Sequence, residues 1–436
     1  MGELRIVVDS CAYTCRNVGD LAMLTVAVNR LRELWPAASI QVITSAPQIV
    51  RAHCGDVGTV PLSGRRLVLQ DRLLGRVDKL LPARIAARWD RAERRLRLRN
   101  PALVGLSLRL KRTVTGRGFN DAAAFLSAVD RADLCVVSGA GVLTDAFLEN
   151  ALGVLATLEM AAERGIPTAM FGQGIGPIVG AELRSRAADV LPRVGLIAVR
   201  ERLSSVGLLE SLGVSPERIV VTGDDAIEMA MPGGGNDAAL AGVPGRRIGV
   251  NMRVAPYADV TPEHLGIVRD ALREASQVHA AELVPLPIAH RDRMDVATLQ
   301  ELLADMPGDD VDGGASLDTP QRVIRRVSDC RIVVAGSYHA GVFALAQGIP
   351  VVALAGSRYY LDKMRGLADQ FGQGCEVVPL EPASRLASRL TDAMNSAWEN
   401  ADLLRPSLLA RAAAQVASGR AAYERVATMV RGQAVA

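Results

Sequence analysis

The residue best suited to acid–base chemistry in this sequence is His339, one of only five histidines. It lies in residues 332–356, IVVAGSYHAGVFALAQGIPVVALAG, a stretch without Asp, Glu, Lys or Arg. Its patterns predict a buried strand at 332–335, a helix at 339–347 and a second strand at 351–354. His339 should therefore begin a helix beyond the carboxyl end of a parallel strand, where α/β sheets bind ligands and helices favour anions. Because imidazole titrates near neutrality, His339 is a candidate general acid–base, with a helix-capping or core histidine as the alternative.

Glycine-bearing turns are expected after four strands in the first half of the chain. They are NVGD at 17–20, SGAG at 138–141, GQGIGP at 172–177 and TGDD at 222–225. Glycine lets the backbone approach a ligand and leaves amide groups free to bind it. Because parallel strands end at one edge of a sheet, the four turns together predict a binding cleft.

Two further residues in that half could act on a substrate. Arg200 directly follows a predicted buried strand at 196–199, and Asp224 lies in the TGDD turn. An arginine there can hold an anionic substrate, and a carboxylate can orient a base or bind hydroxyls. The alternative role for Asp224 is a helix N-cap.

Several common cofactor motifs are missing from the sequence. No glycine turn matches the dinucleotide fingerprint or the phosphate loop. No closely spaced His, Cys and acidic residues have metal-ligand spacing, and no Gly-x-Ser-x-Gly elbow is present. We therefore expect chemistry that uses neither a metal nor a cofactor.

Strand and helix patterns alternate along the 436 residues, which predicts an α/β protein of two doubly wound domains. The most linker-like stretch, 231–247, contains PGGGND. We therefore expect an N-terminal Rossmann-like domain over residues 1–235 and a C-terminal one over 236–436, facing a central cleft. The last helices, from about 382 to 431, are candidates for crossing back to the first domain.

The segment from Arg65 to Arg117 is strongly basic. It holds 16 Lys or Arg and 4 Asp or Glu, a local net charge of +12 in a chain of net charge +3. Leucine or valine recurs at helical spacing at 69, 73, 77 and 80. A basic amphipathic helix of this kind binds anionic membranes or acidic polymers, and a solvated helical insertion is the alternative. A nucleic-acid partner is not expected, because few aromatic residues interleave and no binding motif occurs.

The remaining compositional features favour a cytoplasmic location. The sequence begins MGELRIVVDS, without the charged and apolar segments of a signal peptide. The six cysteines do not pair by spacing, as expected of reduced thiols. If the basic segment binds lipid, the protein would be peripheral at the inner face of the membrane.

Seven motifs, in order, resemble the polysaccharide pyruvyl transferase family. They are NVGDLAM, DLCVVSGAGVLTD, GQGIGP, AVRERLSSVGLLESLGV, TGDDA, SYHAGVFALAQGIPVVAL and YYLDKMRGL, and they span about residues 5–375 apart from the basic segment. The resemblance implies a fold like that of the second major glycosyltransferase class, GT-B. It also implies transfer of a pyruvyl group from phosphoenolpyruvate to a sugar, forming a ketal across two hydroxyls of a glycan or lipid-linked acceptor.

The same motifs imply which residues are functional. The catalytic positions are His339, Arg200 and Asp224, and the substrate-binding positions are Asn17, Gly19, Asp20, Gly139, Gly141, Asp145, Gln173 and Lys363. Arg253 and Ser337 are also expected to bind substrate.

Two departures from the family pattern concern the donor. Ser337 stands where the family usually has arginine, and Glu201 where it usually has aspartate. Phosphoenolpyruvate carries a phosphate and a carboxylate, so its site needs at least two fixed cations. Losing one arginine removes about 1.5–3 kcal/mol of charge-assisted hydrogen bonding. The candidates to replace it around the Ser337 position are Arg200, Arg253, Arg358 and Lys363.

Two other functions fit the same pattern. A glycosyltransferase that uses a nucleotide sugar shares the fold, but its retaining members present a glutamate near the second-domain helix. No carboxylate occurs here from Ile332 to Leu361. A non-catalytic sugar-binding relative would explain the lost arginine, but not the retention of His339, Arg200 and Lys363.

Overall fold

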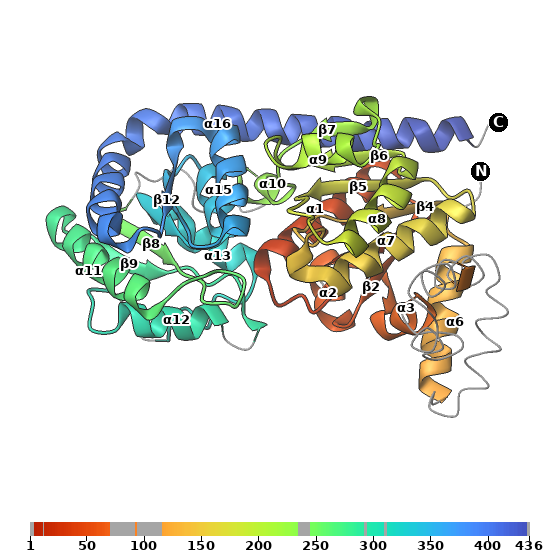
Figure 1. The fold of residues 1–436 in the computed structure, drawn as a ribbon, viewed down its shortest axis with the longest axis horizontal. Coiled ribbons are helices and arrows are strands. Elements are labelled where there is room, and N and C mark those ends of the chain that lie inside the picture. Colours follow the sequence, from red (N-terminus) through yellow and green to blue (C-terminus); the bar gives the residue numbers. More distant parts are fainter. Residues whose placement is uncertain are drawn as a thin grey trace.

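The computed structural model describes residues 4–11, 13–69, 92–93, 116–233, 245–291, 294–308 and 312–433. Within these residues the chain forms two parallel sheets, each covered by helices (Figure 1). The first sheet has the strand order β3-β2-β1-β4-β5-β6-β7, and the second has the order β12-β11-β10-β8-β9. Apolar runs such as LCVV and IVVA form the central strands because both faces are buried. The α/β, GT-B-like fold class predicted from the sequence is confirmed.

The first half of the chain builds the seven-stranded sheet. Its strands are β1 (Arg5–Asp9), β2 (Ser39–Thr44), β3 (Gly58–Pro61), β4 (Leu134–Val137), β5 (Thr168–Gln173), β6 (Leu196–Val199) and β7 (Ile219–Val221). Its helices are α1 (Val18–Leu34), α2 (Pro47–Cys54), α3 (Leu62–Leu69), α6 (Gly116–Asp130), α7 (Leu148–Glu163), α8 (Ala181–Val190), α9 (Ser205–Ser211) and α10 (Ala226–Ala230).

The second half builds the five-stranded sheet and a long final helix. Its strands are β8 (Arg247–Asn251), β9 (Glu282–Pro285), β10 (Ile332–Ala335), β11 (Val351–Ala355) and β12 (Cys375–Pro379). Its helices are α11 (Pro262–His279), α12 (Met294–Leu303), α13 (Pro320–Ser328), α14 (Tyr338–Ala346), α15 (Arg358–Phe371) and α16 (Leu386–Gln433).

Each sheet has one point where the strand order reverses. In the first sheet it lies between β1 and β4, and in the second between β10 and β8. Loops that leave neighbouring strands at such a point turn to opposite faces, which opens a crevice at the carboxyl ends of the strands. The loops after these four strands lead to Asp20, Gly141, Arg253 and His339. The two reversal points thus supply part of the cleft between the halves, and the loops after β6 and β7 together with α15 supply the rest.

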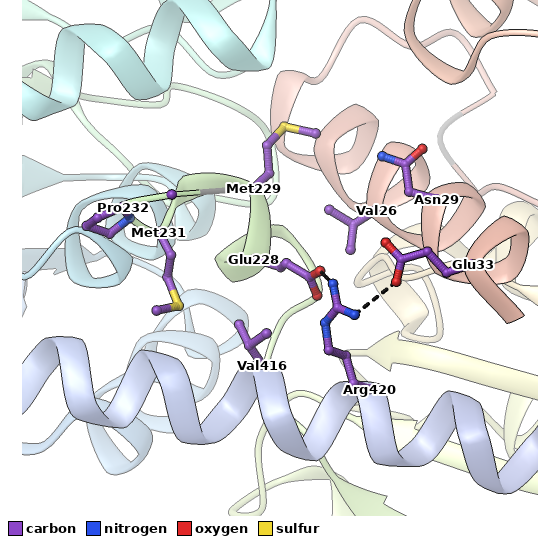
Figure 2. Close-up of a pocket in the computed structure, with 10 residues that line it drawn as sticks. Val26, Asn29, Glu33, Glu228, Met229, Met231, Pro232, Val416 and Arg420 are labelled. Carbon is purple, nitrogen blue, oxygen red and sulfur yellow. Dashed lines mark hydrogen bonds and ion pairs between the residues drawn. The ribbon is translucent and has the colours of Figure 1, made fainter. Parts of the chain in front are cut away.

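Helix α16 connects the two halves along one side of the molecule (Figure 1). Its first part packs on α11 and β12, and its last part lies against β5, β6 and α1. The buried ring of Tyr423 stacks on Phe171 of β5, with 3.6 Å between ring centroids. Nearby, Arg420 bridges Glu33 of α1 and Glu228 of α10 beside a pocket (Figure 2). The helix therefore fixes the second half of the chain to the first.

The uncharged stretch at 332–356 forms the expected strand, helix and strand, namely β10, α14 and β11. Gly348, with a φ of +76°, follows α14 and allows the chain to turn into β11. Within the part of the chain that the structure describes, no helix is long and apolar enough to cross a membrane.

Two sequence predictions fall largely outside the described residues. The boundary near residue 235 lies in 234–244, so the domain division remains a prediction. Most of the basic segment lies in 70–91 and 94–115, so its helical nature and its partner remain predictions as well. Its first residue, Arg65, is 1% exposed and its Nη1 lies 2.9 Å from Asp9. The prediction that Arg65 belongs to the exposed basic segment is therefore wrong, because its side chain is part of the core.

Candidate active site

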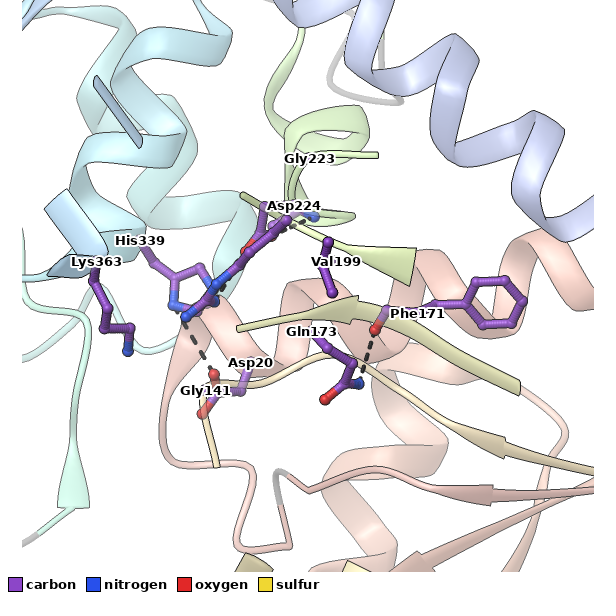
Figure 3. Close-up of polar contacts among 12 residues, drawn as sticks. Asp20, Gly141, Phe171, Gln173, Val199, Gly223, Asp224, His339 and Lys363 are labelled. Carbon is purple, nitrogen blue, oxygen red and sulfur yellow. Dashed lines mark hydrogen bonds and ion pairs between the residues drawn. The ribbon is translucent and has the colours of Figure 1, made fainter. Parts of the chain in front are cut away.

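The cleft between the halves brings His339 against two carboxylates of the first half (Figure 3). The imidazole Nδ1 lies 3.9 Å from Asp20 Oδ1, and Nε2 lies 3.6 Å from Asp224 Oδ2. Both distances suit ion pairs and are too long for direct hydrogen bonds. His339 is 6% exposed, in the first turn of α14. The imidazole therefore lies between two carboxylates in a place that is largely closed to solvent.

Gly19 provides the space that the imidazole occupies. A Cβ at this position would lie 2.0 Å from Cγ and 2.2 Å from Nδ1 of His339. Asn17 begins α1 by accepting hydrogen bonds from the amides of Gly19 and Asp20. The NVGD turn thus places Asp20 and leaves room for a side chain from the other half.

Asp224 connects the imidazole to Arg200. Its Oδ2 lies 3.3 Å from Nη1 of Arg200, and both side chains are 1% exposed. Burial alone would raise the pKa of Asp224, but His339, Arg200 and the Ala226 amide together hold it below its usual value. The carboxylate is therefore ionised at neutral pH and keeps a negative charge beside the imidazole.

Two cations from opposite halves converge over Gly141. A Cβ on this glycine would lie 2.8 Å from Lys363 Nζ and 2.9 Å from Arg200 Nη2. Gly174 likewise leaves room for the guanidinium, whose Nη2 would lie 2.6 Å from a Cβ there. The two glycine turns therefore shape a small pocket around these two basic side chains, which Glu201 and Asp362 also line. The pocket is lined by Gly141, Gly174, Ile175, Gly176, Arg200, Glu201, Ser204, Tyr338, Tyr359, Asp362 and Lys363.

Tyrosines form the wall of this pocket, which the sequence analysis did not predict. The Arg200 guanidinium lies 4.0 Å from the ring centroid of Tyr338, within cation–π range. Lys363 Nζ lies 2.7 Å from the hydroxyl of Tyr359, which in turn donates to the carbonyl of Gly141 at 3.2 Å. The only signal in the sequence was the adjacency of these tyrosines to the histidine and lysine motifs.

Several buried polar atoms around the cleft have no hydrogen-bond partner among the described residues. They are Nη2 of Arg200, Nε2 of His339, Oγ of Ser337 and Oε1 of Gln173. Buried polar atoms are normally satisfied, so a group of unsatisfied ones at a cleft indicates where a polar ligand binds. Ser337, where the family usually has arginine, is one of them.

Four of the expected binding residues mainly support the backbone in this structure. Asn17 caps α1, and Asp145 accepts hydrogen bonds from the amides of Val179 and Gly180. Gln173 donates to the carbonyls of Val137 and Phe171. A Cβ on Gly139 would lie 2.0 Å from Cε of Met23, so this glycine serves close packing. Their expected contact with substrate remains a prediction.

The candidates for replacing the lost arginine differ in where they lie. Arg253 is buried and makes two hydrogen bonds to Asp295, of 2.8 and 2.7 Å. Arg358 is exposed and pairs with Asp362 on the surface of α15. Arg200 and Lys363 are the two that line the pocket itself.

A second buried ion pair lies directly behind the site. Arg30 Nη1 lies 2.6 Å from Asp225 Oδ1, and the hydroxyl of Tyr423 donates to Asp225 at 3.0 Å. The two aspartates of the TGDD turn therefore face different partners: Asp224 faces the cleft and Asp225 holds α16. Among the described residues, no three His, Cys, Asp or Glu side chains form a metal-binding group.

Comparison with solved structures shows the same fold at low sequence identity. The glycotransferase of kitacinnamycin is 14% identical, with a TM-score of 0.54 and coverage of 99% of this chain and 100% of its own. UDP-GlcNAc 2-epimerase from Neisseria meningitidis, bound to UDP-GlcNAc, is 11% identical, with a TM-score of 0.53 and coverage of 99% and 100%. A glycosyltransferase from Rickettsia africae is 11% identical, with a TM-score of 0.51 and 99% coverage of both chains. These similarities establish a GT-B-like architecture.

Comparison at the family level is more specific. No curated protein matches the chain. The family model described as polysaccharide pyruvyl transferase matches residues 17–358, from the cap of α1 to the start of α15. This match includes His339, Arg200 and Asp224, which the fold brings together in the cleft. The chain is therefore a transferase and belongs to the polysaccharide pyruvyl transferase family.

Proposed function

We propose that this protein transfers a pyruvyl group from phosphoenolpyruvate to two hydroxyls of a sugar in a glycan or lipid-linked acceptor. The observation that carries the proposal is the convergence of Arg200 and Lys363, from opposite halves, over Gly141. A donor with a phosphate and a carboxylate needs two basic groups to bind it, and this pocket offers Arg200 and Lys363. The adjoining acid–base group, His339, is the other requirement of the reaction.

The reaction can be assigned to these side chains step by step. Protonation of the donor's methylene carbon turns it into a methyl group and leaves a cation-like carbon that a sugar hydroxyl attacks. That hydroxyl gives its proton to the group that protonated the methylene carbon, and phosphate leaves with the electron pair of its C–O bond. A second hydroxyl then closes the ketal and passes its proton to the departing phosphate. We assign the proton transfers to His339, with Asp224 orienting its ring and stabilising its charged form. Arg200 and Lys363 bind the donor's anionic groups and stabilise the departing phosphate.

Calorimetry of donor binding tests this assignment. We expect phosphoenolpyruvate to bind, and Arg200→Ala to weaken binding by about 1.5–3 kcal/mol, or roughly ten- to a hundredfold. The matched control is Arg273→Ala, which removes a partly exposed arginine paired with Asp270 on α11, away from the pocket, and should leave affinity unchanged. Binding of UDP in place of phosphoenolpyruvate would instead favour a nucleotide-sugar glycosyltransferase. Unchanged donor affinity in Arg200→Ala would remove Arg200 from the donor site.

A further inference from the structure

Lys363 is an unusual residue in this sequence. The chain contains 47 arginines but only three lysines, Lys79, Lys111 and Lys363. Lys363 is the only one that falls within the described residues. Arginine remains charged at every accessible pH, whereas lysine loses its proton readily when it is buried. A lysine in the cleft of an arginine-rich protein therefore suggests that this position needs a basic side chain whose charge can change.

The surroundings of Lys363 disfavour a charged amine. Nζ lies 4.5 Å from the ring centroid of Tyr359 and donates a hydrogen bond to the hydroxyl of the same tyrosine. Among the described residues it forms no ion pair with a carboxylate. The shared approach to Gly141 places Nζ less than about 6 Å from the Arg200 guanidinium, a like charge. Lys363 is partly buried, and a charge that is largely removed from water without an opposite partner is disfavoured.

The charged and titratable groups facing Lys363 come from every element around the pocket. They are Asp20 of α1, Arg200 and Glu201 after β6, Asp224 after β7, Arg253 after β8, Tyr338 of α14, and Tyr359, Tyr360 and Asp362 of α15. Each carboxylate in this set already has another neighbour: Asp224 pairs with Arg200, Asp362 pairs with Arg358, Glu201 accepts hydrogen bonds from Ser204 and Ser205, and Asp20 lies 3.9 Å from His339. Burial first, and then Arg200, lower the pKa of Lys363 well below the usual 10.5.

We propose that Lys363 is a proton-coupled anion receptor, an uncharged amine in the empty cleft that takes up one proton when a phosphate-bearing anion binds beside Arg200. The anion supplies the missing opposite charge, so the amine gains a proton from solvent as the anion enters. The inference rests on the proposed anionic donor and adds that its binding is linked to pH. Because the charge is present only with the anion, the empty cleft avoids two adjacent unpaired cations.

The proposed uncharged state of Lys363 in the empty cleft is tested without any ligand. Competitive labelling with an amine-reactive reagent over a pH series, with added N-acetyl-lysine amide as reference, gives the titration midpoint of each lysine by peptide mass spectrometry. Because there are three lysines in the whole chain, the Lys363 peptide is easily assigned. We expect its midpoint well below that of the reference amine. A midpoint at or above the reference would overturn the proposal.

Proton uptake is tested by calorimetry with two probes, inorganic phosphate and phosphoenolpyruvate, in buffers of different ionisation enthalpy. We expect both titrations of the wild-type protein to show uptake of close to one proton. Lys363→Arg, which cannot lose its charge, should bind both anions without uptake, and Lys363→Met should bind them more weakly. Binding of phosphate but not phosphoenolpyruvate, with uptake, would support the inference while refuting the proposed donor. Binding without uptake in the wild type, or failure of both anions to bind, would refute the inference.

Discussion

The imidazole of His339 lies 3.6 Å from the carboxylate of Asp224, although the two residues follow strands of different sheets. Asp224 lies after β7 in the first half of the chain, and His339 begins α14 in the second. Neither half therefore contains the proposed acid–base pair alone. The relative placement of the halves, which α16 helps to fix, is part of the candidate active site.

His339→Ala should abolish turnover and leave the protein folded, and replacing Gly19 with alanine should have the same effect. The added Cβ would lie 2.0 Å from the imidazole and force it to move, and a displacement of about 1 Å can reduce turnover by about a hundredfold. The matched control is Gly207→Ala, because Gly207 is an exposed glycine of α9 with open space around it. Steady-state turnover and thermal melts of the three variants check this. Retention of more than a tenth of wild-type turnover in both His339→Ala and Gly19→Ala would remove His339 from the acid–base role.

The neighbouring aspartates should differ in whether turnover needs them. Asp224→Asn removes the charge beside His339 and the buried partner of Arg200, and should lower kcat by about 10²–10⁴-fold as well as reduce stability. Asp225→Asn weakens the contact with Arg30, which keeps its ion pair with Glu228, and should reduce the free energy of unfolding by about 1–3 kcal/mol without changing kcat of the folded protein. Denaturant unfolding and kcat of the folded fraction, measured on both variants, separate the two roles. An unchanged kcat in Asp224→Asn would argue that Asp224 is simply structural.

Filling the space over Gly141 should block the anion pocket. Gly141→Ala places a methyl group within 2.9 Å of Arg200 and Lys363, whose flexible tips can move without disturbing the fold. We expect phosphoenolpyruvate affinity to fall by about ten- to a hundredfold, which corresponds to the loss of one charge-assisted contact. Gly266→Ala, on an open face of α11, is the control and should bind normally. Normal donor affinity in Gly141→Ala would place the donor elsewhere.

The lowered pKa of Lys363 also predicts how stability changes with pH. Below pH 10.5 the amine of Lys363 is protonated in the unfolded chain, whereas the folded protein disfavours the charged amine. Lys363 therefore reduces the stability of the folded protein at pH values below 10.5. This loss grows as pH falls from 10.5 towards the lowered value. Lys363→Met should therefore melt at a higher temperature than wild type at neutral pH, with the difference shrinking as pH approaches 10.5. A difference in melting temperature that does not change with pH would contradict the lowered pKa of Lys363.

The basic segment from Arg65 to Arg117 is predicted to hold the protein on an anionic bilayer. Each Lys or Arg near such a surface contributes about 1 kcal/mol, which falls off within a Debye length. Arg65 is excluded from this sum because it is buried against Asp9. We expect co-sedimentation with phosphatidylglycerol vesicles at low salt, release at high salt, and none with phosphatidylcholine. No binding to anionic vesicles at low salt would mean that the segment is a solvated insertion or binds the acceptor.

The sequence predicted those features that depend on local pattern. The strand, helix and strand around His339 were readable because apolar runs and glycine punctuation act over a few residues. The association of Arg30 with Asp225 and Tyr423 was not readable, because it depends on where α16 docks almost two hundred residues later. For the same reason Tyr359 was missed as a partner of Lys363 and Gly141. Asp145 shows a further limit, since a motif residue can bind backbone amides in place of a substrate.

The central claim is that phosphoenolpyruvate is the donor and a sugar the acceptor. It is tested most directly by incubating the protein with phosphoenolpyruvate carrying ¹³C at its central carbon, together with a panel of glycans and lipid-linked sugars, and recording ¹³C spectra and phosphate release. We predict that one acceptor class will produce a ketal carbon signal and an equal amount of phosphate, both absent with His339→Ala. Unchanged phosphoenolpyruvate across the panel, with transfer of a sugar from a nucleotide donor in the same assay, would contradict it.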